Sequence, residues 1–447
     1  MSIVMKFGGT SVANAAALEN VARIVATQRD RAPVVVVSAM SGVTDALLSS
    51  TRIASERGAE EAITSLAETF RRHEHAAEEL LPSPAGFIEY LNNAAKQISQ
   101  LLTRTANERP TQDAIVSFGE MLSSRLLAQT LKHRGVNAQQ VDPRCCIITD
   151  DEYTCAAPLM AETSTKSQQS LLPILNDKVV PVVGGFVGAT AKGTTTTLGR
   201  GGSDYTAALL GAALGVNEIQ IWTDVTGVLT ADPRVVPDAQ TVERLSYSEA
   251  AELAYFGAKV LHPKTIQPAI EDRIPVRICN SRAPQERGTL VGPQTETSPR
   301  TIKAIAHKTG VTTVQITSAR MLGAYGFLRA LFEVFERHRT VVDVVTTSEV
   351  SVSLSLDDDS TLPAVVEELE QLGTVRVEKG QAIICVVGEG LRGTPGIAAR
   401  VFSTISDINV TLISQGASSI NVTFAIEETR AAEAVSRLHD AFFPNSK

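Results

Sequence analysis

The sequence is poor in aromatic residues and carries no excess of positive charge. Phe, Trp and Tyr make up 4% of its 447 residues, which leaves few side chains on which nucleic-acid bases could stack. The formal net charge is −8, from 41 Lys and Arg against 49 Asp and Glu, so the surface as a whole does not attract a phosphate backbone. We therefore expect no nucleic-acid partner, and any anionic ligand must be held by a local site.

Metal-binding, export and membrane signals are also missing. The five cysteines show no CxxC spacing and no neighbouring histidine, which is typical of reduced thiols and not of a zinc site. The N-terminal stretch MSIVMKFGG lacks the charged start and long apolar core of a signal peptide. The longest apolar runs, such as 34–37, are far shorter than a membrane span. We expect a cytoplasmic protein with no protein-built metal site and no membrane partner.

Short runs rich in Val and Ile alternate with amphipathic stretches over residues 1 to about 280. The runs predict buried strands, and the stretches between them have the apolar spacing of helices. Strands that alternate with helices indicate an α/β fold with a mainly parallel sheet flanked by helices. The expected strands are 3–7, 33–38, 179–184, 219–222 and 274–278, and the expected helices include 15–28, 121–133, 205–214 and 248–253.

A stretch rich in Pro and Gly over residues 281–300 interrupts this pattern and predicts a linker. Beyond it, one pattern of strands and helices occurs twice, which predicts two ferredoxin-like βαββαβ repeats. The first has helices 326–337 and 362–372 with strands 341–346, 350–356 and 375–377; the second has strands 382–387, 410–414 and 420–426 with helices 395–405 and 430–442.

The second repeat is one strand short. The strand-like stretch 303–307 has no other assignment, so we expect it to complete the second repeat, with strands shared between the two. The predicted organisation is an α/β domain over residues 1–295, one repeat over 308–380 and another over 381–447, completed by the strand at 300–307.

The first candidate site is the segment Lys6–Ser11 (KFGGTS), between an expected strand and helix. Gly8 and Gly9 let backbone N–H groups approach an anion, and a helix N-terminus adds positive potential. Lys6 contributes a full positive charge. A plain tight turn with a surface lysine explains the segment equally well when it is taken alone.

The second candidate is Thr197–Thr206 (TLGRGGSDYT), again at a junction of loop and helix. Arg200 can grip a carboxylate or phosphate with two N–H groups, and Ser203 or Asp204 can cap the helix. Helix capping alone needs neither the arginine nor an additional carboxylate, so we favour a binding function for this segment.

Two further segments offer contacts to phosphate. Trp222–Val228 (WTDVTGV), with the ADPR sequence at 231–234, leaves an expected strand where parallel sheets commonly bind ligands. Phe256–Pro263 (FGAKVLHP) offers a glycine and a lysine, although its histidine is equally explained as a packed helix end. The GxGxxG match at 388–393 is followed by too little chain for a dinucleotide fold, and no GxxxxGK[ST] occurs, which excludes a P-loop enzyme.

Together these segments resemble the motifs of the aspartate kinases of the amino acid kinase superfamily, and the C-terminal repeats resemble their paired ACT regulatory domains. The resemblance covers essentially the whole chain. It implies transfer of the γ-phosphoryl group of ATP, with Mg²⁺, onto the β-carboxylate of L-aspartate to give 4-phospho-L-aspartate, the first step of lysine, threonine and methionine biosynthesis. A carboxylate nucleophile is already ionised near neutral pH, so the protein must align two anions and needs no general base.

The resemblance also implies roles for individual residues. Lys6 stabilises the transferring phosphoryl group, Asp204 organises the lysines or the metal environment, and Arg200 holds the substrate α-carboxylate. The positions that match substrate contacts are Ser38, Thr44, Glu120, Phe186, Arg200 and Ser203. The positions that match ATP contacts are Lys6, Gly8, Gly9, Thr223, Asp224, Leu229, Arg234 and Lys259. Leu229 and Thr194 depart from the family pattern, since an aromatic and a basic residue are expected there.

The regulatory half resembles the effector site of lysine-inhibited enzymes at Met321, Ala324, Asp343, Thr347, Ser348 and Glu349. Asp343 and Glu349 can bind the ammonium groups of an effector, although a turn and a solvated strand edge explain them as well. Lysine is favoured over threonine as the effector. Exposed edges of ACT-type sheets favour pairing, so we expect a homo-oligomer, a dimer or tetramer.

Two other functions are compatible with parts of the pattern. One is an amino acid kinase acting on glutamate or an acetylated amino acid, but such relatives do not usually carry the tandem repeat. The other is an amino acid sensor with a degenerate kinase fold. The presence of Lys6, Arg200 and Asp204 argues against the sensor.

Overall fold

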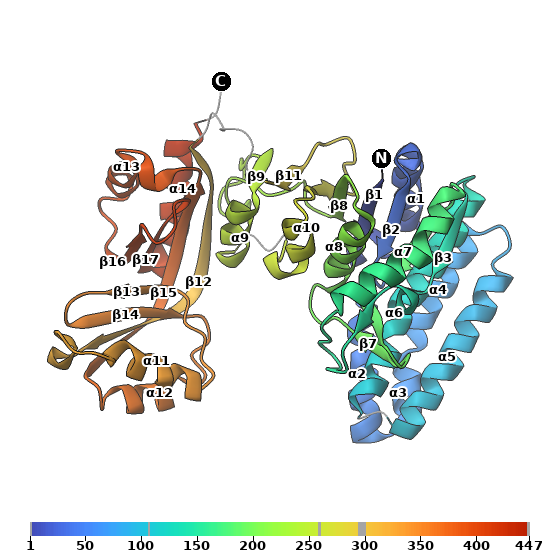
Figure 1. Ribbon diagram of the computed structural model, residues 1–447, viewed down its shortest axis with the longest axis horizontal. Coiled ribbons are helices and arrows are strands. Elements are labelled where there is room, and N and C mark those ends of the chain that lie inside the picture. Colours follow the sequence, from blue (N-terminus) through green and yellow to red (C-terminus); the bar gives the residue numbers. More distant parts are fainter. Residues whose placement is uncertain (1, 106–107, 258–260, 294–300, 445–447) are drawn as a thin grey trace. The chain divides into compact units, whose positions relative to one another are not determined.

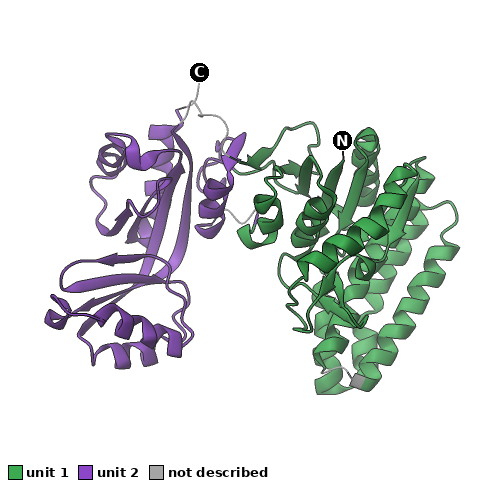
Figure 2. Ribbon diagram, in the orientation of Figure 1, with its two compact units in different colours: residues 1–228, 262–294 green, residues 229–261, 295–447 purple. Residues whose placement is uncertain are grey.

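The computed structural model describes residues 2–105, 108–257, 261–293 and 301–444 (Figure 1). The chain forms two compact units (Figure 2). Unit 1 comprises residues 1–228 and 262–294, and unit 2 comprises residues 229–261 and 295–447. Residues 229–261, which precede the expected linker, are therefore part of unit 2.

Unit 1 is built on a mainly parallel sheet. Its strands follow the order β3, β5, β2, β1, β8 and β10, all parallel, and β11 joins β10 in the antiparallel direction. Phe7 at the end of β1 lies opposite Val37 on β2 and Trp222 on β8, so the loops that follow these strands meet at one edge. The bounds are β1 Ile3–Phe7, β2 Pro33–Val37, β3 Ala138–Val141, β5 Val180–Gly184, β8 Glu218–Thr223, β10 Val276–Asn280 and β11 Thr289–Gly292.

Helices flank this sheet, so the predicted α/β class is confirmed. α8 packs on β1, β2 and β8, while α6 packs on β2, β3 and β5. The helices α2 and α5 in turn pack against α6. A small second sheet holds β4, β6 and β7. The bounds are α1 Ala15–Thr27, α2 Val43–Arg57, α3 Ala59–Ser65, α4 Ala67–Leu80, α5 Ala85–Thr105, α6 Arg109–His133, α7 Met160–Asn176, α8 Gly202–Leu214, α10 Gln267–Glu271, β4 Ile148–Thr149, β6 Val187–Thr190 and β7 Thr195–Thr197.

Some local predictions in unit 1 are wrong. The helix expected from residue 121 begins at Arg109, with a proline in its first turn where the missing N–H costs nothing. The expected linker contains strand β11, which is entered through Gly288 at φ +64°. A side chain on Gly288 would overlap the Ile278 carbonyl, so the glycine that suggested a loop is needed for close pairing with β10.

Unit 2 contains a six-stranded antiparallel sheet in the order β13, β14, β12, β15, β17 and β16. Its helices pack against this sheet and form two separate apolar cores. The bounds are β9 Arg244–Ser246, α9 Tyr247–Tyr255, β12 Ile302–Thr317, α11 Phe327–Arg337, β13 Val345–Thr347, β14 Ser351–Leu356, α12 Leu362–Leu369, β15 Thr374–Gly388, α13 Ile397–Thr404, β16 Val410–Gln415, β17 Asn421–Glu427 and α14 Ala431–Phe442.

Two long strands, β12 and β15, run through both repeats. Residues 311–317 of β12 pair with 374–381 of β15, whereas 302–308 pair with 383–388. The separate strands expected at 375–377 and 382–387 are thus one strand, and Gly380 at φ +67° lies between its two halves. The strand expected at 341–346 is also wrong, because only 345–347 is a strand. The N–H of Asp343 donates to the Ser355 carbonyl at 3.0 Å outside the regular ladder.

The segment 229–261 belongs to unit 2 because its apolar residues share a core with the second repeat. Ala231 and Val236 are buried in one cluster with Ile305, Val386 and Leu438. Thr230 adds a polar anchor, since its hydroxyl lies 2.9 Å from His439 Nε2. Across the described ranges, no helix is both long enough and apolar enough to cross a membrane.

Candidate active site

A cavity of about 610 Å³ lies in unit 1, where β1 and β2 end and α8 begins. Its volume is in the range of small-molecule sites, and polar residues from distant segments converge on it. The predicted site residues that line it are Lys6, Gly9, Ser38, Thr44, Glu120, Phe186, Arg200, Ser203 and Asp204. Every residue predicted to bind the substrate is therefore brought to one cavity.

Lys6 and Asp204 form an ion pair at its wall. Lys6 Nζ lies 2.6 Å from Asp204 Oδ1, and the two side chains are only 11% and 17% exposed. Lys6 comes from β1 and Asp204 from the first turn of α8, where a carboxylate is favoured by the helix dipole. The pair orients the ammonium group, which has three N–H donors, and leaves donors for an anion.

The loop before α8 carries Arg200 between two glycines with positive φ, Gly199 at +72° and Gly201 at +76°. A Cβ on Gly201 would lie 2.7 Å from Thr265 Cγ2, so both the conformation and the space require glycine there. α8 begins at Gly202, with Gly201 in the cap position. The prediction that Ser203 or Asp204 caps the helix is therefore wrong, and both side chains line the cavity instead.

Glu120 is a buried carboxyl group on α6, only 3% exposed. Its Oε1 accepts a hydrogen bond from the Ala39 N–H at 3.1 Å. Its Oε2 has no hydrogen-bond partner among the described residues, and burial raises the pKa of this carboxyl to about 8. A buried polar atom without a partner, at the wall of a cavity, indicates that a ligand supplies the missing donor.

Phe186 stands in a left-handed conformation, with φ +68°. Such a conformation costs about 1–2 kcal/mol for a residue with a Cβ, and two hydrogen bonds hold it. The Phe186 N–H donates to Thr206 Oγ1 at 2.9 Å, and its carbonyl accepts from the Leu198 N–H at 2.9 Å. The backbone that borders the cavity is thus fixed against α8 and β7.

The nucleotide contacts are only partly supported. Gly8 donates its N–H to the Trp222 carbonyl at 3.1 Å, which occupies the donor that the sequence analysis assigned to a phosphate. Gly8 thereby joins β1 to β8, and its contact to the nucleotide stays a prediction. Thr223 ends β8 in unit 1 and Asp224 follows it, and the Thr223 carbonyl accepts from the Ser281 N–H at 2.8 Å.

The other predicted nucleotide contacts belong to unit 2 or lie outside the described residues. Leu229 and Arg234 are in unit 2, and Arg234 pairs with Asp232 at 2.6 Å on the surface. Lys259 lies outside the described residues. Ser281 was missed by the sequence analysis, although it links Thr223 to Ser11 of the KFGGTS segment through a hydroxyl contact of 2.8 Å; nothing local in the sequence reveals that contact.

The predicted effector residues lie around the first repeat of unit 2. Met321 and Ala324 form a turn before α11, and Thr347, Ser348 and Glu349 lie at the end of β13. The side chain of Asp343 is only 4% exposed, and burial together with the neighbouring Asp357 raises the pKa of its carboxyl. Lys308 Nζ lies 3.9 Å from Asp343 and also pairs with Asp357, so an ammonium group of the chain already faces this carboxylate.

A profile of the amino acid kinase family matches residues 1–280, and a profile of the ACT domain matches residues 384–442. The chain is 40% identical over 458 residues to aspartokinase 1, chloroplastic, of Arabidopsis thaliana, an alignment that covers 99% of this chain and 80% of that protein. It is 38% identical to lysine-sensitive aspartokinase 3 of Escherichia coli, over 99% of each chain. This chain belongs to the aspartokinases of the amino acid kinase family.

Solved aspartokinase structures agree with this membership. Escherichia coli aspartokinase III in complex with aspartate and ADP (R-state) matches with a TM-score of 0.83 and 37% identity, covering 99% of this chain and 100% of that one. The same protein in complex with lysine and aspartate (T-state) matches with a TM-score of 0.84 and 38% identity, over 99% of each chain. The family recognised from the motifs is therefore confirmed.

The described residues contain no group of three or more His, Cys, Asp or Glu side chains arranged to hold a metal ion. A carboxylate does lie in the cavity next to a lysine, which fits an ion that is held mainly by nucleotide phosphates, as is usual for Mg²⁺. The cavity also has polar residues that the sequence analysis missed, among them Asp113 and Thr154. Asp113 precedes Glu120 by two helical turns, a spacing that places both on one face of α6.

Proposed function

We propose that this protein is an aspartate kinase, which transfers the γ-phosphoryl group of ATP to the β-carboxylate of L-aspartate and releases 4-phospho-L-aspartate and ADP. The observation that carries the proposal is that one cavity unites the Lys6–Asp204 ion pair, Arg200 and the half-satisfied carboxyl group of Glu120. The aspartate and ADP bound by Escherichia coli aspartokinase III support the choice of substrates. The product enters lysine, threonine and methionine biosynthesis.

Aspartate is a zwitterion with two carboxylates, and the cavity has a counterpart for each of its groups. Arg200 holds the α-carboxylate with its planar pair of N–H donors. Glu120 Oε2 accepts a hydrogen bond from the ammonium group, which supplies the donor that this buried oxygen otherwise lacks. Ser38, Thr44, Phe186 and Ser203 close the remaining wall around the side chain of the substrate.

The reacting β-carboxylate needs no base, because it is ionised well below neutral pH. The obstacle is the repulsion between this anion and the γ-phosphate. Lys6 places a positive charge at the junction, and Asp204 fixes its orientation. Oriented charge in a water-poor site stabilises the transition state of phosphoryl transfer.

In unit 1, Gly9, Thr223 and Asp224 are the proposed nucleotide contacts. Leu229, Arg234 and Lys259 remain nucleotide contacts proposed from the family resemblance alone. Bound with ATP, Mg²⁺ would neutralise phosphate charge, and Asp204, which lines the cavity beside Lys6, would help to hold it. The proposed catalytic domain extends over residues 1–295, although residues 229–261 of this range belong to unit 2. The ACT domains extend over 308–380 and 381–447, the second completed by residues 300–307, and the pairing of 302–308 with 383–388 supports that completion.

Lysine is the proposed feedback inhibitor, bound around Met321, Ala324, Asp343, Thr347, Ser348 and Glu349. The carboxylate of Asp343, whose side chain is only 4% exposed and which already faces the ammonium group of Lys308, supports recognition of a second ammonium group there. The lysine-sensitive relative in Escherichia coli and the ACT profile support this regulation.

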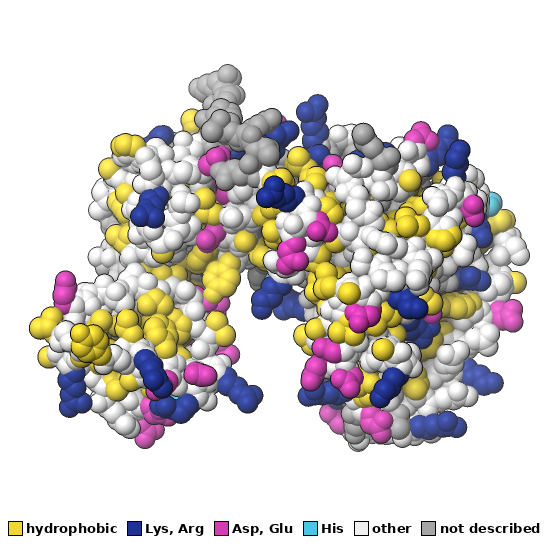
Figure 3. Space-filling view, in the orientation of Figure 1, with side chains coloured by type: hydrophobic (Ala, Val, Ile, Leu, Met, Phe, Trp, Pro, Cys, Tyr) yellow, Lys and Arg dark blue, Asp and Glu magenta, His cyan; other side chains and the backbone are white. Residues whose placement is uncertain are grey.

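The proposed assembly is a homodimer or tetramer formed through the ACT domains. Hydrophobic side chains are exposed around α11, including Leu322, Tyr325, Leu328, Phe332 and Val341. Figure 3 shows hydrophobic side chains over the end of unit 2 that carries α11 and α12. Exposed apolar groups that gather in this way are typical of an interface, and a second copy of the chain is the proposed partner. The proposed location is the cytoplasm.

The decisive experiment measures amino-acid-dependent ADP release with ATP and Mg²⁺, using L-aspartate, L-glutamate and N-acetyl-L-glutamate. Hydroxylamine traps the acyl phosphate as a hydroxamate. We expect activity with aspartate alone, and a fall of at least about 100-fold in kcat/KM for aspartate in Arg200→Ala. The control is Arg57→Ala, which removes an exposed arginine paired with Glu61. ADP release with glutamate but not aspartate would refute the proposal.

A further inference from the structure

We infer that Asp113 is a positioning residue that fixes the loop carrying Arg200, an inference that rests on the proposed function. Asp113 lies on α6, seven residues before Glu120, and lines the same cavity. It is only 2% exposed. The buried carboxyl groups of Asp113 and Glu120 therefore line one cavity from the same helix. Their hydrogen bonds show that the two groups have different roles.

The carboxylate of Asp113 is satisfied by the protein itself. Its Oδ2 accepts hydrogen bonds from the Thr154 N–H at 2.9 Å and the Thr197 N–H at 3.0 Å, and its Oδ1 accepts one from Thr197 Oγ1 at 2.7 Å. Glu120, by contrast, keeps one oxygen to which no described residue donates a hydrogen bond. Asp113 thus holds protein segments together, whereas Glu120 is available to a ligand.

The two segments that Asp113 joins lie next to Arg200. Thr197 ends β7, two residues before Gly199, and its carbonyl accepts from the Ala156 N–H at 2.9 Å. A Cβ on Gly199 would lie 3.2 Å from Cys155 Sγ and 3.4 Å from the Thr154 carbonyl. The turn that leads into Arg200 therefore rests directly on the 154–155 segment.

Thr154 itself is held in a conformation that threonine avoids, with φ +73°. A β-branched residue in the left-handed region is stable only when its surroundings impose that conformation, and the hydrogen bond to Asp113 is the one that restrains the Thr154 N–H. Removal of the carboxylate leaves two backbone N–H groups without acceptors and releases this restraint. The 154–155 segment, against which Gly199 packs, then shifts, and the guanidinium of Arg200 shifts with it.

The substrate most affected is aspartate. Arg200 is proposed to bind its α-carboxylate, and a displacement of about 1 Å at a reacting centre costs about 100-fold in rate. The phosphate-binding Lys6 is positioned independently of Asp113, because it lies on β1 and is oriented by Asp204. Loss of Asp113 should therefore raise KM for aspartate without raising KM for ATP. A general loss of folding would instead affect both substrates.

The test compares KM for aspartate and for ATP in Asp113→Ala, Asp113→Asn, Thr197→Val and Thr197→Ser. We expect KM for aspartate to rise about 10- to 100-fold in Asp113→Ala and KM for ATP to stay within about twofold. Thr197→Ser keeps the hydroxyl donor to Asp113 and should retain the wild-type KM for aspartate. Thr197→Val lacks this donor and should raise KM for aspartate. This pair decides the question even if the Asp113 variants fail to fold.

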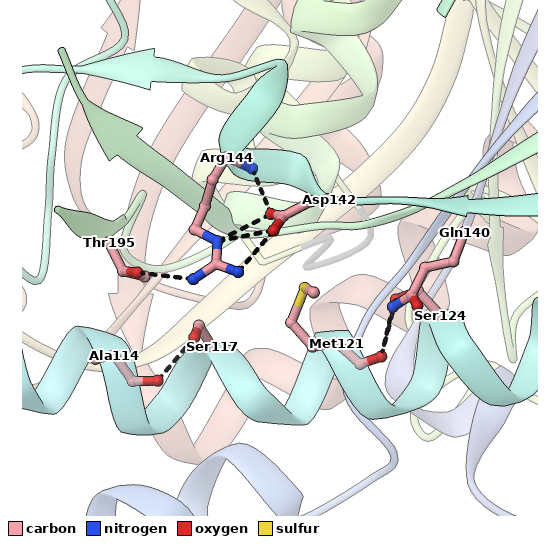
Figure 4. Close-up of polar contacts among 8 residues, drawn as sticks. All are labelled: Ala114, Ser117, Met121, Ser124, Gln140, Asp142, Arg144 and Thr195. Atoms are coloured by element: carbon pink, nitrogen blue, oxygen red, sulfur yellow. Dashed lines mark hydrogen bonds and ion pairs between the residues drawn. The ribbon is translucent and has the colours of Figure 1, made fainter. Parts of the chain in front are cut away.

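The matched control is Gln140→Leu. Gln140 donates to the Met121 carbonyl and to Ser124 Oγ, each at 2.9 Å, and so contacts the same helix α6 at residues that do not line the cavity (Figure 4). We expect a lower melting temperature and an unchanged KM for aspartate. An unchanged KM for aspartate in Asp113→Ala, or equal rises for both substrates, would overturn the inference.

The outcome is distinguishable from failure of the proposed function. If the wild-type enzyme phosphorylates a different amino acid, the proposed function is wrong, and the same comparison of KM values with that substrate still tests Asp113. If the wild-type enzyme uses aspartate and the variants behave as Gln140→Leu does, only the inference about Asp113 is wrong.

Discussion

Glu120→Gln isolates the one titratable group that is proposed to bind the substrate ammonium group. The change keeps the size of the side chain and its acceptor toward the Ala39 N–H, but removes the proton equilibrium. In the empty enzyme, burial holds the pKa of Glu120 at about 8. The ionised fraction is then about one half at pH 8, about one tenth at pH 7 and about one hundredth at pH 6.

An ammonium group is bound well only by the ionised carboxylate, so the apparent KM for aspartate varies inversely with that fraction. KM is expected to fall about ninefold between pH 6 and pH 7 and about fivefold between pH 7 and pH 8. Glu120→Gln binds aspartate weakly throughout and loses this slope. KM for ATP provides the internal control, since Glu120 is not proposed to contact the nucleotide.

The assay is coupled ADP release at constant ionic strength, with saturating ATP and Mg²⁺ and aspartate varied at each pH between 6 and 8. A KM for aspartate that is independent of pH in the wild-type enzyme would show that Glu120 is not protonated in the empty site. A slope that survives in Glu120→Gln would assign the titration to another group. Either result refutes the reasoning.

The raised pKa of Glu120 also determines whether the free energy of unfolding rises or falls with pH. The pKa of Glu120 is raised from 4.5 to about 8 in the folded state, so the folded protein holds a proton that the unfolded chain has lost. Its contribution to stability is complete below pH 4.5 and is lost as pH rises to about 8. Relative to the wild type, unliganded Glu120→Gln should gain about 1.4 kcal/mol in unfolding free energy per pH unit over that range, measured by urea titration.

Three further outcomes are expected. Lys6→Ala lowers kcat by about 100- to 1,000-fold, because the charge beside Asp204 is lost at the site of phosphoryl transfer; ADP release at saturating substrates measures it, and near-normal turnover would exclude the assigned role. Asp343→Asn raises the lysine concentration for half-inhibition by about tenfold or more while the KM values persist, whereas the exposed Asp358→Asn control responds to lysine normally. Tyr325→Glu places a charge in the exposed apolar group around α11 and lowers the molar mass measured by light scattering; a mass equal to that of the wild type would place the interface elsewhere.

The sequence by itself determined the class of fold and the chemical content of the site. Runs of buried Val and Ile identify parallel strands, because such strands are covered on both faces. Parallel strands end at one edge of the sheet, so the loops after β1 and β2 were bound to meet. Glycine next to lysine, arginine and carboxylate is a local signal, and it identified Lys6, Arg200 and Asp204, whereas the resemblance to the aspartate kinases supplied Ser38, Thr44, Glu120 and Phe186.

Only the tertiary structure decided which of these groups are available to a ligand. The N–H of Gly8 is used by Trp222, far along the chain, and Asp113 is satisfied by Thr154 and Thr197. One oxygen of Glu120, by contrast, finds no partner in the described part of the chain. Likewise, only packing showed that residues 229–261 share a core with the second repeat. The reason is physical: periodicity and propensity act over a few residues, but a buried donor or acceptor finds its partner wherever the folded chain places one.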